Sequence, residues 1–217
     1  MPDNVAVEKG VDTMSDISLN DAIYSQRAIR KFENRPVSEE LVYQVLDAAI
    51  RAPSGGNRQP WFFIVIRDVN KKQQIAKLYK SSFEQAYGSP SQNQRLGNLV
   101  YNSANYLAHH MSECPVLILA CVQHDGSASS MSRGSSIYPA VQNLMLYARA
   151  LGLGTVITTL HKRYENEIKS ILGIPENVET AALIPMGYLG ADEHFGGSRR
   201  VPVESVTFRD TWGEVGL

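Results

Sequence analysis

Hydrophobic positions along the chain follow two patterns, one typical of buried strands and one typical of helices. Apolar runs without alternating polar residues occupy residues 61–66, 115–122 and 180–188. Such runs indicate strands that are buried on both faces. The β-branched stretch at 155–159 predicts a fourth strand. The segments between these runs have apolar residues three and four positions apart, which is the spacing of one helical face.

Six helices are expected from that spacing, at residues 16–26, 38–51, 70–87, 96–111, 137–151 and 163–172. Ser38 is a plausible N-cap of the second, and Gly173 follows the end of the sixth. The helix at 137–151 is apolar almost all the way round, so it belongs in a core or an interface. A Ser-rich loop is expected at 126–136, and a Gly-, Ser- and Pro-containing link at 88–94.

The order of these elements predicts one α+β domain from residue 16 to residue 217, because neither an internal repeat nor a clear boundary interrupts it. Residues 1–15 carry four charges and lack an apolar signal core, which favours a flexible N-terminal arm over a targeting peptide. Phe208 and Trp212 in the last stretch, 201–217, favour a tail that docks on a surface.

Composition excludes several functional classes. The 217 residues are 43% hydrophobic and carry a net charge of −1, so no charge excess favours nucleic acid or a membrane surface. Apolar runs stay well below the roughly 20 residues of a membrane span. Cys114 and Cys121 lie along one apolar run and cannot bridge each other there, which fits a reduced, cytoplasmic setting.

The stretch from Ala52 to Trp61, A-P-S-G-G-N-R-Q-P-W, is the first candidate for a binding site. Pro53 ends the preceding helix, and the two glycines let the backbone turn or approach a flat ligand closely. Ser54, Asn57 and Gln59 add polar side chains, so the loop suits a planar heterocycle with polar edges. An ordinary helix-to-strand connection is the alternative interpretation.

Two separate basic clusters are the second candidate. Arg27, Arg30 and Lys31 alternate with apolar residues near the N-terminus, and Arg199–Arg200 lie near the C-terminus. One bound phosphate would explain both clusters in a nearly neutral chain, although each alone could be a solvated surface. A Walker-type loop and a G-x-G-x-x-G turn after a strand are both absent from the sequence, which argues against P-loop and Rossmann sites.

Taken together, these segments resemble the FMN-dependent nitroreductase family over about residues 17–212. The resemblance rests on the run from Gln26 to Phe32, the loop at 52–61, the Q-N-L helix ending in G-L-G-T at 142–155, the turn Thr158-Thr159-Leu160, and R-R-x-P-V-E at 199–204. It implies a three-layer sandwich in which helices flank a central, mostly antiparallel sheet. It also implies a domain-swapped homodimer in which residues 201–217 dock on the partner, with FMN bound at the interface.

The resemblance also implies roles for individual residues. Arg27, Ala28 and Arg30 would lie in the FMN-binding run, with Arg27 and either Arg199 or Arg200 at the phosphate and Arg30 near the pyrimidine edge of the ring. The ring itself would meet a second set, partly from the partner, made up of Pro53, Ser54, Gly55, Asn57, Thr158, Thr159 and Leu160. Gln26 and Ala28 stand where many relatives have arginine and serine. The two threonines resemble the iodotyrosine deiodinase branch, where such a hydroxyl accompanies one-electron chemistry. The acidic, tyrosyl and lysyl substrate set of that branch has no counterpart between residues 81 and 112.

The remaining polar candidates are assigned to the substrate or to packing. Tyr101, Tyr106 and His161 are candidate substrate contacts. His109 and His110 point about 100° apart on a helix, so no metal site is expected, and Cys114 is expected to pack in the core rather than react.

The sequence therefore predicts an FMN oxidoreductase in which NADH or NADPH and an electron-poor acceptor, such as a nitroaromatic or a quinone, react by a ping-pong scheme. The flavin would carry the chemistry, so no side chain is expected to be catalytic. A flavin-dependent dehydrogenase or reductive dehalogenase, a non-catalytic FMN-binding protein and an interaction module with merely charged surfaces are the alternatives.

Overall fold

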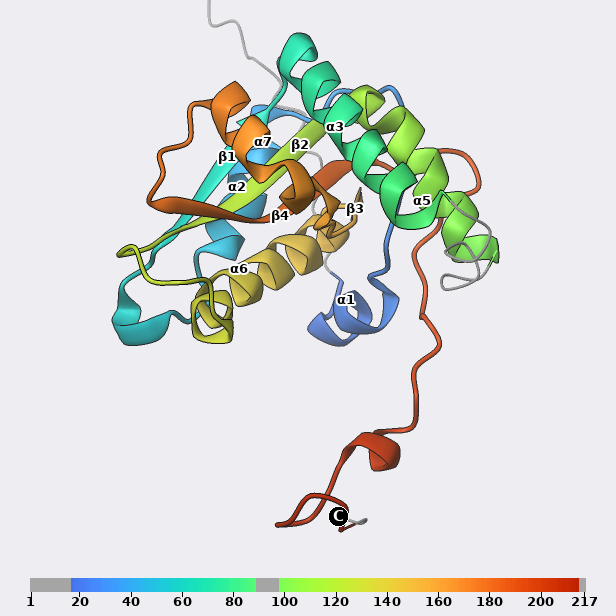
Figure 1. The fold of residues 1–217 in the computed structure, drawn as a ribbon. Coiled ribbons are helices and arrows are strands. Elements are labelled where there is room, and N and C mark those ends of the chain that lie inside the picture. Colours follow the sequence, from blue (N-terminus) through green and yellow to red (C-terminus); the bar gives the residue numbers. More distant parts are fainter. Residues whose placement is uncertain (1–16, 89–97, 215–217) are drawn as a thin grey trace, which may run out of the picture.

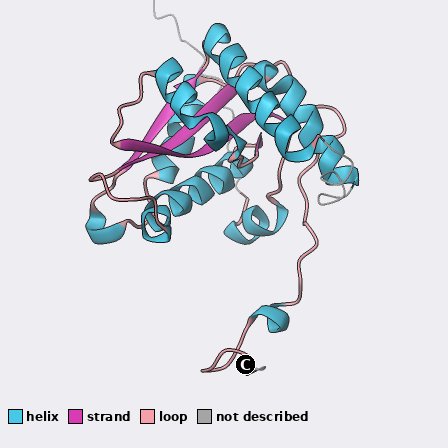
Figure 2. Cartoon of the chain, in the orientation of Figure 1, coloured by secondary structure: helices cyan, strands magenta, loops and turns pink. Residues whose placement is uncertain are grey.

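The computed structural model describes residues 17–88 and 98–214, and these form helices around one antiparallel sheet (Figures 1 and 2). The strands are β1 (Trp61–Ile66), β2 (Val116–Gln123), β3 (Leu153–Thr155) and β4 (Val178–Tyr188). Their order across the sheet is β1-β2-β4-β3, and each neighbouring pair is antiparallel. The expected mostly antiparallel sheet is confirmed.

Strand β2 is the centre of the molecule. All its residues except Gln123 are buried, because β1 and β4 cover its edges and helices cover both its faces. Val116, Ile118, Ala120 and Val122 face one hydrophobic cluster, whereas Leu117, Leu119 and Cys121 face the other. This two-sided burial explains why the sequence of the strand shows no polar alternation.

The helices are α1 (Leu19–Ser25), α2 (Glu39–Ala49), α3 (Val69–Tyr87), α5 (Asn98–His110), α6 (Met131–Ala150) and α7 (Glu165–Leu172). Short 3-10 turns occupy Gly55–Asn57, Met111–Glu113, Leu160–Tyr164 and Val203–Val206. The predicted caps are present, since the Ser38 hydroxyl accepts from the Leu41 amide at 3.2 Å and Gly173 ends α7 with φ 68°.

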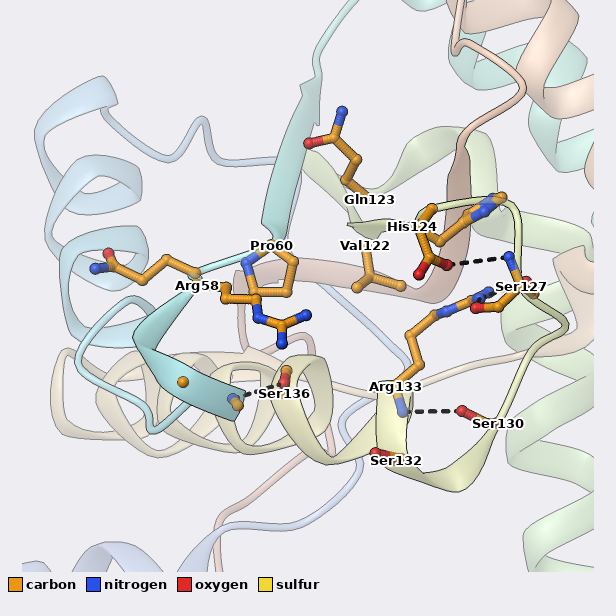
Figure 3. Close-up of a pocket in the computed structure, with 14 residues that line it drawn as sticks. Arg58, Pro60, Val122, Gln123, His124, Ser127, Ser130, Ser132, Arg133 and Ser136 are labelled. Atoms are coloured by element: carbon orange, nitrogen blue, oxygen red, sulfur yellow. Dashed lines mark hydrogen bonds between the residues drawn. The ribbon is translucent and has the colours of Figure 1, made fainter.

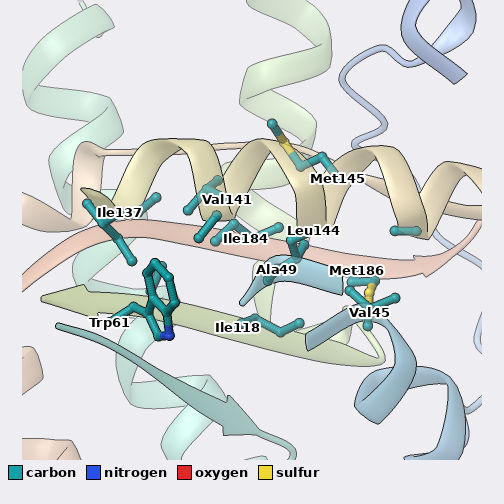
Figure 4. Packing of buried hydrophobic residues seen from close by; sticks show 14 of the residues in the cluster. Val45, Ala49, Trp61, Ile118, Ile137, Val141, Leu144, Met145, Ile184 and Met186 are labelled. Atoms are coloured by element: carbon teal, nitrogen blue, oxygen red, sulfur yellow. The ribbon is translucent and has the colours of Figure 1, made fainter. Parts of the chain in front are cut away.

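Helices cover the sheet on both faces, which confirms the three-layer α+β arrangement (Figures 1 and 2). On one face α2 and α6 pack against the sheet, and Figure 4 shows Ile137, Val141 and Leu144 of α6 lying over Ile118 and Ile184. On the other face α3, α5 and α7 bury Phe83, Leu107 and Ile168 in the second cluster. The nearly all-round apolar sequence of α6 thus supplies a core, as expected.

The two largest differences from the predicted boundaries are at α6 and β3. Helix α6 begins at Met131 instead of residue 137, because the Ser130 hydroxyl caps it by accepting from the Arg133 amide at 3.2 Å. The serines that predicted a loop therefore form a cap and a first turn. Strand β3 ends at Thr155, and Thr158 keeps only a single bridge to Leu183, so the predicted strand at 155–159 is wrong.

The segment from residue 190 to residue 196 returns along the chain that follows α1. Gly190 donates to the Lys31 carbonyl at 3.0 Å, and Gly196 donates to the Ser25 carbonyl at 2.8 Å. Beyond it the chain extends away from the body, and Trp212 is 90% exposed (Figure 1). The predicted N-terminal arm and most of the predicted 88–94 link lie outside the described residues. None of the helices within the described ranges has the length and apolar character needed to cross a membrane.

Candidate functional site

The basic run at 27–31 is held in place by its own backbone. Ile29 donates to the Thr155 carbonyl at 3.0 Å, and Ala28 forms a bridge to the same residue. Ile29 packs directly against Gly154, which has no side chain. A Cβ at position 154 would come within 2.6 Å of the Ile29 side chain, so only glycine fits there. On the other side, the Glu193 carboxylate accepts from the backbone amides of Arg30 and Lys31 at 3.3 and 3.1 Å.

The side chain of Arg30 is a half-buried cation. Its guanidinium Nη1 donates to Ser103 of α5 at 3.4 Å. Burial lowers the pKa of Arg30, while Tyr79 and Glu193 act in the opposite direction. In the part of the chain that the structure describes, no carboxylate lies within 4.0 Å of the guanidinium of either Arg27 or Arg30. A partly desolvated, unpaired guanidinium is suited to an anion or an electron-rich ring edge.

Tyr79 lies close to both Arg30 and Thr158, so it connects Arg30 with the turn at Thr158–Leu160. The backbone of Thr158 exchanges hydrogen bonds with Leu183 at 3.0 and 2.9 Å, and its hydroxyl donates to the Leu183 carbonyl at 3.0 Å. Tyr79 lies next to the same Thr158 side chain, and burial raises the pKa of Tyr79 to about 12. The single proton of the Thr158 hydroxyl is thus already used. Thr159 is exposed and its hydroxyl can donate outward, whereas Leu160 is half-buried against the core. We call Arg27, Arg30, Thr158, Thr159 and Leu160 the arginine half-site.

The loop after α2 is an exposed but well-defined turn. Gly56, Asn57 and Gln59 have positive φ angles of 60°, 52° and 50°. The Ser54 hydroxyl accepts from the Gln59 amide at 3.0 Å, and the Gly55 amide donates to Ser136 of α6 at 3.2 Å. These bonds hold the loop in a backbone conformation that L-residues rarely adopt. Such conformations are often found where a loop contacts a ligand. We call Pro53, Ser54, Gly55 and Asn57 the loop half-site.

A cavity of about 660 Å³ adjoins the loop half-site (Figure 3). Figure 3 shows the Arg58 side chain directed into it, with His124 on the opposite wall. Arg133, also in the lining, is committed to an ion pair with Glu179 at 2.6 Å. The cavity is therefore polar, and Arg58 is the cation in its lining that forms no ion pair within the described ranges.

The two half-sites lie at opposite ends of α6 (Figure 1). Ser136 near its start bonds to the loop half-site, whereas Arg149 near its end donates to Ser25, two residues before Arg27, at 2.9 Å. Thirteen residues of helix separate Ser136 from Arg149, a rise of about 20 Å. One chain therefore does not bring the two predicted sets of residues together.

The other predicted residues are placed as follows. Arg199 and Arg200 are exposed on the segment that leaves the body, and Arg200 donates to the Arg199 carbonyl at 3.2 Å. Tyr106 stacks on His110 with ring centroids 4.1 Å apart and lies 5.3 Å from the Lys31 amine, next to the basic run. Tyr101 packs on Phe83 at 5.7 Å and is half-buried.

His161 is buried in the core, whereas a substrate contact must be accessible. The 3-10 turn carries its ring inward, where it is fully buried and its Nε2 lies 3.1 Å from the Thr180 hydroxyl. Burial, aided by the neighbouring Lys162, lowers the pKa of His161 to about 4, so the ring is neutral. The structure thus corrects its assignment as a substrate residue.

Cys114 is a packing residue, as expected. Both cysteines are free and buried. Burial raises the pKa of Cys114 to about 12, against the opposite effect of Lys72, so the thiolate needed for reaction is not formed.

Sequence comparison identifies the family. The profile of the nitroreductase family matches residues 23–188. The chain belongs to the nitroreductase family. It is 30% identical over 175 residues to an Archaeoglobus fulgidus protein provisionally named NADH dehydrogenase/NAD(P)H nitroreductase, covering 80% of this chain and 86% of that one. It is 26% identical to human iodotyrosine deiodinase 1 over 187 residues, covering 83% of this chain and 64% of the human protein.

The fold agrees with this assignment. The crystal structure of an oxidized iodotyrosine deiodinase bound to FMN and 3-iodo-L-tyrosine superimposes with a TM-score of 0.71 and 24% identity, covering 88% of this chain and 100% of the other. This likeness supports the nitroreductase fold.

Three residues of this nitroreductase-family site escaped the sequence analysis. Glu193, Ser103 and Tyr79 contact Arg30 or its surroundings, yet they lie on three separate segments far from it in sequence. Neither spacing nor composition marks them, because only the folded chain brings them together.

Proposed function

We propose that this protein is an FMN-dependent oxidoreductase, that its FMN sites are shared between two copies of the chain, and that NADH or NADPH is the electron donor. When bound, FMN supplies redox chemistry by which reducing equivalents from the donor reach an electron-poor acceptor, such as a nitroaromatic or a quinone, in a ping-pong scheme. Membership of the nitroreductase family supports the reaction class. The observation that carries the cofactor assignment is the unpaired, half-buried guanidinium of Arg30.

The residues of the arginine half-site fit FMN chemically. Arg27 and Arg30 are cations whose guanidinium groups have no carboxylate partner within the described ranges, as a phosphate and an electron-rich ring edge require. Arg30 lies deeper than Arg27, in contact with Ser103 and near the buried Tyr79. We therefore assign Arg27 to the phosphate and Arg30 to the ring, where its fixed positive charge stabilises negative charge electrostatically.

Thr158 and Thr159 divide their roles. Thr158 fixes the turn, because its backbone and hydroxyl are all bonded to Leu183. Thr159 is left to donate to the ring with its exposed hydroxyl. The side chains hold charge and orientation, and none of them needs to act as an acid or base.

The separation of the half-sites supports a homodimer. Ser54, Gly55 and Asn57 cannot reach a ring held by Arg30 of the same chain, since α6 lies between them (Figure 1). A two-fold partner would supply its loop half-site to this arginine half-site and receive the same in return. An apolar groove of about 410 Å³ between α1, α2 and α6, which includes Leu146 and Tyr147, is the surface we assign to this contact. Exposed Tyr43 and Ile50 of the α2 segment extend the same apolar character.

Reductive dehalogenation is the second candidate. It is favoured by the likeness to iodotyrosine deiodinases and by the adjacent Thr158 and Thr159 at the turn. Tyr106, beside the basic run, and Tyr101 remain the proposed acceptor contacts in either case.

The decisive experiment is a visible absorbance spectrum of the purified full-length protein followed by turnover. A yellow protein that oxidises NADH or NADPH only when a nitroaromatic or quinone is present supports the proposed reductase. Release of iodide from 3-iodo-L-tyrosine, with little nitroaromatic reduction, would favour the second candidate. A colourless protein that takes up no FMN would refute both.

A further inference from the structure

Two side chains that can both carry positive charge lie side by side at the edge of the arginine half-site. The Nη1 atom of Arg27 is 3.3 Å from the Nε2 atom of His194. Within residues 17–88 and 98–214, no carboxylate lies within 4.0 Å of either side chain. A guanidinium can only donate, so Nε2 accepts and the ring proton is carried by Nδ1. With the proton on Nε2 instead, the two facing nitrogen atoms are both donors and suit one shared anion.

The position of His194 is fixed by the contacts of its sequence neighbours and not by Arg27. On one side of it, the Glu193 carboxylate is bonded to the amides of Arg30 and Lys31. On the other side, the Arg149 guanidinium lies 4.0 Å from the centre of the Phe195 ring, and Gly196 donates to Ser25. These anchors fix the histidine next to an arginine, an arrangement that gains little by itself because neither group neutralises the other. An anion that accepts from both would complete it.

We propose that His194 binds the FMN phosphate together with Arg27, an inference that rests on the proposed function. A phosphate monoester offers several acceptor oxygens, and Nη1 of Arg27 and Nε2 of His194, 3.3 Å apart, supply donors from two segments of the chain when Nε2 carries the ring proton. Ala28, next to Arg27 in the basic run, has no side-chain donor to contribute. His194 thus adds a donor in place of the side-chain donor that Ala28 lacks, and it joins the arginines that distinguish FMN from riboflavin.

The test compares FMN with riboflavin, which lacks the phosphate. Full-length wild-type protein and the variants Arg27→Ala, His194→Ala and His194→Gln are titrated with each flavin by fluorescence. The control is His109→Ala, an exposed histidine on α5 whose contacts are the Asn105 carbonyl and Glu84. Losing one such hydrogen bond is worth about a fivefold to tenfold loss of affinity.

We expect His194→Ala to weaken FMN binding by about that factor and to leave riboflavin binding unchanged. His194→Gln, which retains one N–H donor, should recover part of the loss. Arg27→Ala should lower the ratio of FMN to riboflavin affinity further, and His109→Ala should leave the ratio at the wild-type value.

Other outcomes overturn the inference separately from the proposed function. If Arg27→Ala lowers the ratio while both His194 variants keep it, His194 does not bind the phosphate although the FMN site stands. If His194→Ala and His194→Gln weaken both flavins equally, the histidine only supports the fold of its segment. If the wild-type protein binds neither flavin, the proposed function itself fails.

Discussion

The arginine half-site and the loop half-site are built in opposite ways. Arg30 is half-buried and its backbone is bonded to Glu193, on a segment more than 160 residues away in the chain. The loop half-site is exposed, and it is defined by local bonds between residues 54 and 59 and by one bond to α6. The arginine half-site is held by contacts with distant parts of the chain. The loop half-site is held by local hydrogen bonds in a backbone with positive φ angles. A site that combines them has a half-buried, positively charged side and an exposed side formed largely by loop backbone.

If one flavin contacts both half-sites, as we propose, a single chain is insufficient. Helix α6 is a rigid spacer with one half-site at each end, so bending the loop cannot close the gap. A second copy in the opposite orientation solves this without any change of conformation, because the same spacing then works twice.

The largest effect is expected from removing residues 201–217. Residues 201–214 leave the body, and Phe208 and Trp212 pack on each other, with ring centroids 4.9 Å apart and Trp212 90% exposed. Two large aromatic side chains on an extended segment are stabilised when they dock on a partner. We expect the truncated protein to be flavin-free or insoluble, whereas Arg209→Ala in the same tail keeps its flavin. Visible absorbance measures the flavin content, and analytical ultracentrifugation measures the oligomeric state. A yellow, monomeric truncation product would contradict the proposed dimer.

Acidification should destabilise the core behind the arginine half-site through His161. Its pKa is about 4 in the folded protein and about 6.5 when exposed, so the unfolded chain binds the extra proton first. The stability that His161 contributes is therefore complete above pH 6.5 and is lost as the pH falls toward 4. The loss amounts to about 3 kcal/mol.

Urea unfolding at pH 7.5 and 4.5 measures this effect. His161→Gln should remove most of the pH dependence, and His109→Gln should retain it. Glu179, whose pKa is lowered from 4.5 to about 2, begins to lose its contribution only near pH 4.5, so it adds little to the change across this window. An equal loss of stability in both variants would assign the effect to other groups.

Arg200→Ala should lower FMN affinity more than Lys31→Ala does. Arg200 is exposed and its guanidinium donates to the neighbouring Arg199 carbonyl, so its other N–H groups remain able to bind a phosphate. The Lys31 amine instead lies over the Tyr106 ring. Loss of one charge-assisted phosphate contact costs about 1.5–3 kcal/mol. Fluorescence titration with FMN compares the two, and equal retention of flavin would remove Arg200 from the site.

The smallest effect concerns the loop half-site. Gly56 has φ 60°, so Gly56→Ala forces an L-residue into the left-handed region and should cost about 1 kcal/mol of unfolding free energy. Gly55→Ala is the matched control, because its φ is ordinary and its new Cβ would meet only the Ser136 hydroxyl, at 3.9 Å. Denaturant unfolding of both variants measures the difference. Equal stabilities would show that the loop relaxes without strain.

Much of this architecture was predictable from sequence. The apolar runs identified β1, β2 and β4 because burial on both faces removes polar residues, and Ser38 and Gly173 marked helix ends because capping has strict chemistry. Prediction failed where tertiary contacts override local preference. Thr155–Thr159 has β-branched residues, yet the strand ends after Thr155 and His161 turns into the core to meet Thr180.

The site was predictable only as a set of segments. Arg27, Ser54 and Thr158 were recognisable from motifs, but their distribution between the two ends of α6 depends on how the helix is oriented. Glu193 and His194 gave no signal at all, since only the folded chain brings them beside residues 27–31.

The central claim is that each flavin site combines the arginine half-site of one chain with the loop half-site of another. Mixing two flavin-deficient variants tests it most directly, one carrying Arg27→Ala and Arg30→Ala, the other with a disrupted loop half-site (Ser54→Ala, Asn57→Ala and Gly56→Val). After co-refolding, random pairing makes half of the dimers mixed, and each mixed dimer has one intact site. The account predicts recovery of about one FMN per four chains. Recovery of no flavin from the mixture, with mixed dimers shown to be present, would contradict it.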